Sequence, residues 1–282
     1  GNVDFSHYFG LVPSDPAYPE DAAAFAWRWA HAPKPYDTDG SIDLAADALA
    51  VYDDVVGSAA PTGSPPRLDD EAGTAVFRSD WSPDAVEAVA LGEHGNAMEL
   101  GRDRDGRGQA ASAAHEQPDT GSYLLHAYGE RLLLDPGYLT YEQRGLVGKA
   151  PDHNLVLVGG KGPGDPFTAS ILWATDPTGR PKVDGQATMT DLLDTPAWDG
   201  ARVDSAYAGA DLTRRFAFVD DRYLVTFDEV RATAGTPLTW VTHGNGGGTS
   251  GGTFTVGTSG GRWAHGAARV DTVLATSAGS PT

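Results

Sequence analysis

Hydrophobic and polar residues alternate in short runs along most of the chain after residue 66. The alternation is visible in Arg215–Val219 and Tyr223–Phe227, and a period of two is typical of strands with one buried face. Gly, Asp and Asn clusters separate the runs, and Val219–Tyr223 suits a hairpin turn. About a dozen strands are predicted in this way: Thr74–Ser79, Val86–Leu91, Asn96–Leu100, Ser122–Tyr128, Arg131–Leu134, Leu155–Val158, Ala169–Ala174, Arg202–Tyr207, Leu212–Val219, Tyr223–Val230, Leu238–Thr242 and Val270–Ala275.

The first 66 residues follow a different pattern. Residues 21–31 are rich in Ala and carry bulky aromatic side chains, and residues 42–56 place apolar side chains at near-helical spacing. Residues 58–66 (SAAPTGSPP) have the composition of a linker. We therefore expect a mainly β protein, with a helical segment and linker over residues 1–66 and a sandwich of stacked antiparallel sheets over 67–282.

The composition narrows the range of partners. The 282 residues include 20 Lys and Arg against 39 Asp and Glu, which gives a net charge of −19. Such a charge argues against nucleic acid or an anionic membrane as a general partner. The absence of Cys excludes disulfides and thiol catalysis. No apolar run reaches the roughly 20 residues of a membrane span. The bias toward Ala, Gly and Asp, with few Lys, is typical of a high-GC bacterium, and acidic, Cys-free chains are common among secreted proteins there, so we expect a secreted or periplasmic protein.

The densest run of chemically capable side chains extends from His115 to His153. Apolar strands interrupt it, so its polar groups fall at strand ends, which is where binding and catalytic sites are often built. Its main members are His115, Gln117, Asp119, Ser122, Glu130, Asp135, Tyr138, Tyr141, His153 and Asn154.

This run resembles the β-sheet domain of heparinase II/III-like polysaccharide lyases, a group that includes alginate lyases. The family pattern is His-x-His-x-Asp-x-Gly-Ser-Phe, Gly-Glu, Asp-x-Gly-Tyr, a later Tyr and His-Asn. The corresponding residues here are His115, Gln117, Asp119, Gly121-Ser122-Tyr123, Gly129-Glu130, Asp135-Pro136-Gly137-Tyr138, Tyr141 and His153-Asn154. The resemblance covers residues 70–245 and implies an α/α toroid ahead of the sheets. Residues 15–56 would be its last part, and the missing toroid segment would supply the other half of the active site.

The resemblance implies β-elimination next to the carboxylate of a uronic acid, which gives a 4,5-unsaturated product. That reaction needs a base and an acid, and His and Tyr suit such proton steps near neutral pH. His115 is then the catalytic histidine, with a solvated loop histidine as the alternative. Tyr141 is the facing tyrosine, with a packing aromatic at the sheet rim as the alternative.

Three further residues are candidates for binding the substrate. Tyr138 lies next to Tyr141 in the family pattern. Arg144 has the guanidinium that holds a carboxylate bidentately, although an ordinary surface arginine is the alternative. His243 follows the apolar run Leu238–Thr242 and could therefore approach the cleft.

Several members of the family hold a structural zinc ion with a His, an Asp and a later His. Asp135 and His153 match two of these ligands, while Gln117 stands at the third. Zinc favours imidazole and carboxylate ligands, and a glutamine oxygen suits calcium better. Zinc, calcium and a metal-free hydrogen-bond cluster therefore remain as alternatives. Asp119 is expected to fix the turn before Gly121.

Three functions follow from the sequence. The first is a polysaccharide lyase acting on an acidic, uronate-containing polymer. The second is a carbohydrate-binding or structural β-sandwich without turnover. The third is a glycoside hydrolase, which needs two carboxylates facing one cleft. The opening residues, Gly-Asn-Val-Asp-Phe, do not resemble a natural start, so we expect a mature or truncated product that has little activity alone.

Overall fold

The computed structural model of the chain describes residues 66–69, 73–92, 118–136, 144–147, 149–163, 187–247 and 251–277. The chain divides into two units, residues 1–64 and 65–282, and all described residues belong to the second. The helical segment predicted within residues 1–66 lies outside the described residues. In the described part, no helix is long and apolar enough to cross a membrane.

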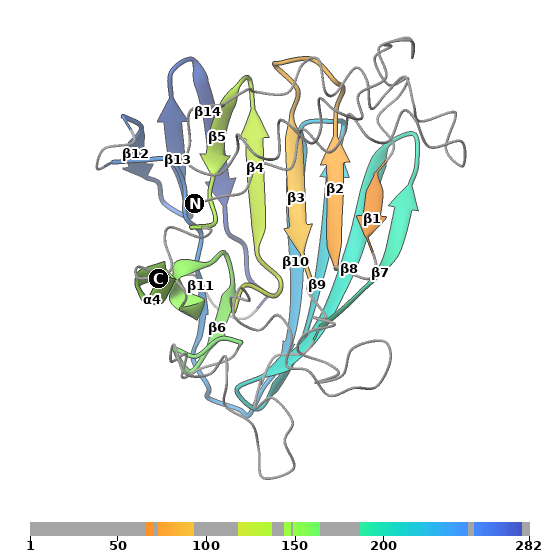
Figure 1. Ribbon diagram of the computed structural model, residues 1–282. Helices are drawn as coiled ribbons and strands as arrows, with labels where there is room; N and C mark the ends of the chain where they lie inside the picture. The colour runs from red at the N-terminus through yellow and green to blue at the C-terminus, as the bar shows by residue number, and fades with distance from the viewer. Residues whose placement is uncertain are drawn as a thin grey trace, which may run out of the picture. The chain divides into compact units, whose positions relative to one another are not determined.

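Two antiparallel sheets form the body of the described structure (Figure 1). The first has the order β1-β2-β3-β4-β5, with β1 (Arg67–Asp69), β2 (Thr74–Arg78), β3 (Glu87–Leu91), β4 (Tyr123–Ala127) and β5 (Glu130–Leu133). The second has the order β10-β9-β8-β7, with β7 (Ala187–Asp194), β8 (Trp198–Tyr207), β9 (Ala210–Val219) and β10 (Tyr223–Arg231). The predicted mainly β fold is thereby confirmed.

Two smaller sheets and two short helices complete the described elements. One sheet pairs β6 (Val156–Val158) with β11 (Leu238–Trp240). The other has the order β12-β13-β14 and contacts β5, with β12 (Thr253–Val256), β13 (Gly260–His265) and β14 (Ala268–Val273). The helices are α4 (Arg144–Val147) and the 3-10 turn η3 (Ala150–Asp152), which precedes β6.

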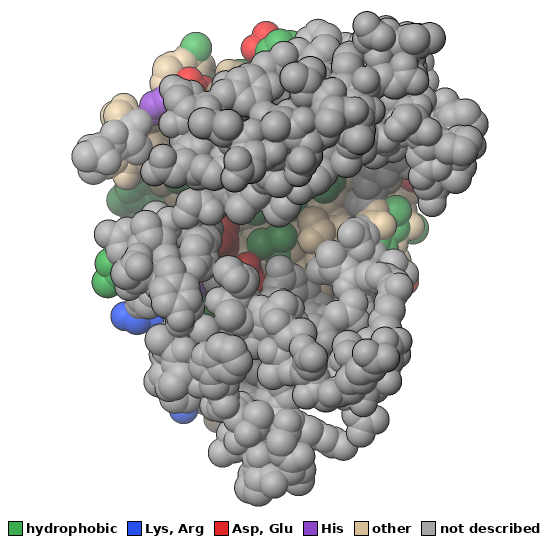
Figure 2. All heavy atoms as spheres, in the orientation of Figure 1, with side chains coloured by type: hydrophobic (Ala, Val, Ile, Leu, Met, Phe, Trp, Pro, Cys, Tyr) green, Lys and Arg blue, Asp and Glu red, His purple; other side chains and the backbone are tan. Residues whose placement is uncertain are grey.

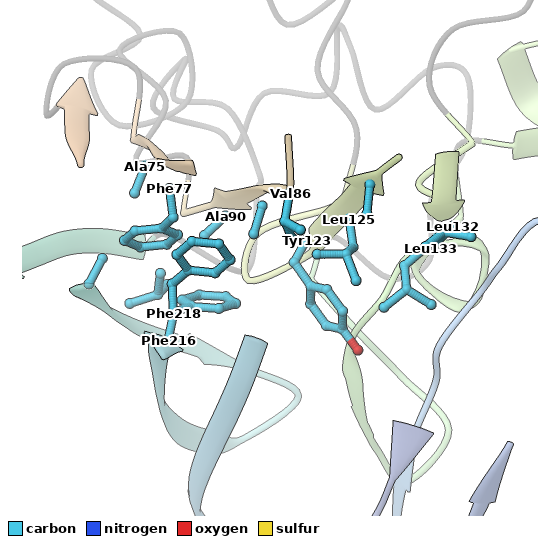
Figure 3. Packing of buried hydrophobic residues seen from close by; sticks show 14 of the residues in the cluster. Ala75, Phe77, Val86, Ala90, Tyr123, Leu125, Leu132, Leu133, Phe216 and Phe218 are labelled. Atoms are coloured by element: carbon cyan, nitrogen blue, oxygen red, sulfur yellow. The ribbon is translucent and has the colours of Figure 1, made fainter. Parts of the chain in front are cut away.

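The main core lies between the two large sheets because each strand buries every second side chain. In β2 the buried residues include Phe77, which pairs with the small Ala88 of β3. The ring of Phe77 faces Phe218 of β9 at a centroid distance of 6.2 Å, and Figure 3 shows the two rings packed together between the sheets. Large rings from the two sheets thus meet in the core, and a small neighbour such as Ala88 lies beside Phe77 within the same sheet.

The predicted strands agree with the described ones wherever both exist. The hairpin at Val219–Tyr223 is also confirmed, since Asp220 and Asp221 both have positive φ and the Arg222 N–H bonds to the Val219 carbonyl. The predicted strands Asn96–Leu100 and Ala169–Ala174 lie outside the described residues. Four strands were not predicted: β1, β7, β12 and β13.

Candidate functional site

Three polar segments that are far apart in sequence meet at one end of the first large sheet. Ser122 stands just before β4, and Asp135 stands just after β5. Because β4 and β5 are antiparallel neighbours, the start of one lies beside the end of the other. The turn that carries His153 joins them there through hydrogen bonds to both strands, close to β6 in Figure 1.

A buried hydrogen-bonded group occupies the centre of this meeting point. Nδ1 of His153 lies 2.8 Å from Oδ2 of Asp135. The same carboxylate oxygen accepts a hydrogen bond from the Ser122 hydroxyl at 2.6 Å. The His153 side chain is fully buried, and the Asp135 side chain is 6% exposed. A carboxylate that holds one imidazole nitrogen fixes the orientation of the ring and the role of its other nitrogen.

Asn154 connects the segments through its whole side chain. Its Nδ2 donates to the carbonyls of Tyr123 and Leu134, at 2.6 and 2.9 Å. Its Oδ1 accepts the backbone N–H of His243 at 2.6 Å. The Asn154 backbone N–H donates to the Ser122 hydroxyl at 3.0 Å. This fully buried side chain therefore satisfies polar groups of three strand ends that would otherwise be unpaired.

The structure brings His243 to the same place. Besides the bond from its backbone N–H to Asn154, its ring Nε2 lies 2.9 Å from the carbonyl oxygen of Pro151. His243 therefore sits against the turn that carries His153, at the edge of the cluster. A role in binding the substrate stays a prediction.

Most of the other residues predicted from the sequence fall outside the described part. His115, Gln117, Tyr138 and Tyr141 are among the residues that the structure does not describe, and their assigned roles stay predictions. Arg144 begins α4, but its side chain is likewise outside the described part.

A group of three ligand-type side chains lies within the cluster. Asp119, Asp135 and His153 each offer one ligand atom, and these atoms all lie within 4.8 Å of one another. Nε2 of His153 is buried and has no hydrogen-bond partner within the described ranges. Such an atom is costly unless something binds it. The donor set of two carboxylates and one imidazole fits a divalent metal ion.

Asp119 is the member of this group that sequence reasoning assigned to a turn. The turn is present, because the Ser122 N–H donates to the Asp119 carbonyl at 2.7 Å and Gly121 has a φ of 90°. The same turn leaves the Asp119 side chain, 9% exposed, beside Asp135 and His153. The sequence signal was its place two residues after Gln117, on the side of the motif that the family uses for metal binding.

The visible described surface is mixed in character. In the space-filling view, acidic and hydrophobic side chains of described residues lie next to each other near the middle of this face, and described Lys or Arg side chains show only toward the lower left (Figure 2).

Comparison with known proteins gives a consistent family. The sequence model described as "Heparinase II/III-like, C-terminal" matches residues 93–277. A search of curated proteins finds no match. The crystal structure of heparan sulfate lyase HepC from Pedobacter heparinus is similar, with 16% identity and a TM-score of 0.53, over 92% of this chain and 34% of that one. The crystal structure of a HepC mutant from the same organism is similar at 15% identity and a TM-score of 0.53, over 92% of this chain and 34% of that chain.

A crystal structure of heparinase III is also similar, with 18% identity and a TM-score of 0.50, over 74% of this chain and 29% of that chain. This chain therefore spans about a third of the length of the lyases that it matches. At these identities the likeness establishes the β-sandwich fold.

Proposed function

The chain belongs to the heparinase II/III-like family, and we propose that it forms the β-sheet part of a polysaccharide lyase that acts on a uronic-acid-containing polymer. One observation carries the proposal. The segments of Ser122, Asp135 and His153, all within the family match, converge into one buried hydrogen-bonded cluster at the end of the sheet. Its members flank, in sequence, the positions that match the family's catalytic histidine and tyrosine, His115 and Tyr141.

The proposed chemistry is β-elimination. A proton leaves the carbon next to the uronate carboxylate, the C4–O4 bond breaks, a double bond forms between C4 and C5, and the leaving oxygen gains a proton. His115 and Tyr141 are the proposed proton-transfer groups, since imidazole and phenol can exchange protons in this way. Tyr138, Arg144 and His243 are the proposed groups that bind the sugar and its carboxylate.

We propose further that Asp119, Asp135 and His153 hold one divalent metal ion, with Gln117 as a candidate fourth ligand. A buried imidazole among the ligands favours zinc over calcium, which takes oxygen ligands almost exclusively. The ion would have a structural role, because it would cross-link the turn at Asp119 to the ends of β5 and η3. Asp119 lies four residues after His115, so the ion would hold the chain close in sequence to the proposed catalytic histidine.

The nature of the product distinguishes this function from its alternatives. Because this chain spans about a third of the lyases that it matches, the assay uses the gene product that contains it. After digestion of heparan sulfate, alginate and hyaluronan, mass spectrometry should find fragments whose masses sum to that of the substrate. A hydrolase would add one water for each bond broken. Saturable binding without fragments would instead indicate a carbohydrate-binding module.

A polymer of this kind lies outside cells, so the proposal includes a secreted or periplasmic location. Fractionation of the source cells should place the protein outside the cytoplasm, and recovery in the cytoplasm alone would contradict this part of the proposal.

A further inference from the structure

An arginine occupies a core position in the second sheet. Along β9 the inward-facing residues are Ala210, Leu212, Arg214, Phe216 and Phe218. Arg214 is 7% exposed, although its neighbours on that face are apolar. A buried charge is expensive unless it is paired and hydrogen-bonded, so its partners indicate why it is there.

All three nitrogens of the guanidinium group donate hydrogen bonds. On one side, Nε and Nη2 donate to the two carboxylate oxygens of Asp228, at 2.6 and 3.0 Å. Asp228 stands directly opposite Arg214 on β10 and also accepts the indole N–H of Trp240 at 2.8 Å. Burial by itself lowers the pKa of Arg214, but the charge and hydrogen bonds of Asp228 raise it above its ordinary value. The side chain therefore stays charged.

On the other side, Arg214 leaves its own sheet. Its Nη1 donates to two backbone carbonyls, that of Gly121 at 2.6 Å and that of Asn154 at 2.8 Å. Gly121 lies two residues after Asp119, and Asn154 directly follows His153. One nitrogen atom, Nη1, therefore binds both the turn that carries Asp119 and the turn that carries His153, two members of the proposed metal group.

A buried ion pair is by itself weak evidence of a role in stability. Replacing such a pair by apolar groups of similar volume is often neutral or stabilising, whereas buried polar groups can fix one arrangement among several. Here the fixed quantity is the separation of the two turns. A planar guanidinium can hold a carboxylate bidentately and two carbonyls at once, while the three donors of a lysine ammonium lie on one nitrogen and cannot match this bidentate geometry.

We infer that Arg214 is a positioning residue of the candidate site: it sets the spacing between the Asp119 turn and the His153 turn from the opposite sheet, with Asp228 as its anchor. The inference rests on the proposed function only for its consequence, namely that this spacing serves a metal ion.

Hydrogen exchange tests the inference without requiring turnover or metal. In Arg214→Lys, amides of residues 119–123 and 152–156 should exchange at least about tenfold faster, because charge-assisted hydrogen bonds to both turns are lost. Amides of β8 should exchange as in the parent. Trp240→Phe is the matched control, since it removes a bond to Asp228 but leaves both carbonyl contacts of Arg214. It should leave both turns protected.

A double variant guards against a folding defect. Arg214→Met with Asp228→Asn removes both charges together and keeps an acceptor for Trp240, so the fold is retained while the two carbonyl contacts are lost. Its two turns should also exchange faster. Parental exchange rates in both variants, or equal acceleration of β8 and the turns, would overturn the inference.

Zinc affinity provides the second readout. Removing a group that orients metal ligands typically weakens binding by about 10- to 100-fold, and Arg214→Lys should do so while Trp240→Phe does not. If the parent chain binds no zinc, the metal proposal fails, and the exchange experiment still decides the role of Arg214.

Discussion

Asp135 and His153 are separated by 18 residues of sequence, yet Oδ2 of one lies 2.8 Å from Nδ1 of the other in an almost closed interior. The contact exists because β5 ends where the turn before β6 passes. Ser122 closes the group from the start of β4. The cluster is therefore a product of strand order and register, and the residues around it control how firmly it is held.

The first prediction concerns Asn154. Asn154→Ala leaves the carbonyls of Tyr123 and Leu134 and the N–H of His243 without their buried partner. We expect the free energy of unfolding to fall by about 3 kcal/mol, because each unsatisfied buried group costs about 1–3 kcal/mol. Urea denaturation measures it, with the exposed Thr239→Ala as control. A loss no larger than that of the control would show that Asn154 is not a structural hub.

The second prediction concerns the metal ion. At a free zinc concentration of about one hundred times Kd, the free energy of unfolding should rise by about 2.7 kcal/mol. Asp119→Asn should abolish most of this gain, while Asp84→Asn, an exposed carboxylate at the far end of the sheet, should retain it. Thermal denaturation with zinc, calcium and a chelator measures the effect. Stabilisation that survives Asp119→Asn would remove this residue from the ligand set.

The third prediction concerns the core. Phe216 is 2% exposed. Its ring lies edge-on to that of Tyr123 from the opposite sheet, with the ring centroids 6.2 Å apart. Phe216→Ala should destabilise the chain by about 4 kcal/mol, through lost burial and the cavity left behind. Phe227→Ala, on the outer face of β10 at 59% exposure, should change stability by less than about 0.5 kcal/mol. Similar losses in both variants would mean that the two sheets do not pack as described.

The fourth prediction is a pH dependence. Burial and the neighbouring Asp194 and Asp221 raise the pKa of Asp199 above 3.8, against a backbone hydrogen bond from Thr195. The native state therefore binds this proton at higher pH than the unfolded state, so the charged carboxylate costs stability at neutral pH. Asp199→Asn should raise the melting temperature at pH 7. The gain should disappear as the pH falls through the raised pKa toward 3.8.

Asp271 serves as a control, because its pKa shift has the opposite sign to that of Asp199. A hydrogen bond from Arg262 and its charge lower the pKa of this exposed carboxyl. Its contribution to stability is present above the unfolded pKa and is lost as the pH falls through the folded pKa. Asp271→Asn should therefore lower the melting temperature slightly at pH 7. Changes of equal sign in the two variants would contradict the pKa shifts described for them.

The sequence predicted the long strands because their alternation is strong. In β9 the buried Phe216 and Phe218 flank Ala217, and the two-residue period is clear. β7 was missed because its second half is exposed and its pairing with β8 is irregular between Thr190 and Leu193. β12 was missed because it is only four residues long, and so short an alternation between Gly-rich segments is a weak signal for a strand.

The candidate site was only partly predictable. Motif order identified Asp135 and His153, which the structure places in contact. It did not identify Arg214: its place in the alternation is that of an inward-facing residue, but arginine is mostly exposed, and only the tertiary contacts show what it binds. Asp119 was missed for a similar reason, since turn residues and metal ligands share the same amino acids.

The most direct test of the proposed lyase function is spectroscopic. The gene product that contains this chain is mixed with heparan sulfate, alginate or hyaluronan, and the ultraviolet absorbance of a 4,5-unsaturated uronic acid is followed with time. We expect the absorbance to rise on at least one polymer, and His115→Ala to abolish the rise with little change in melting temperature. No absorbance on any uronate polymer, or undiminished turnover in His115→Ala, would contradict the proposed function and its catalytic histidine respectively.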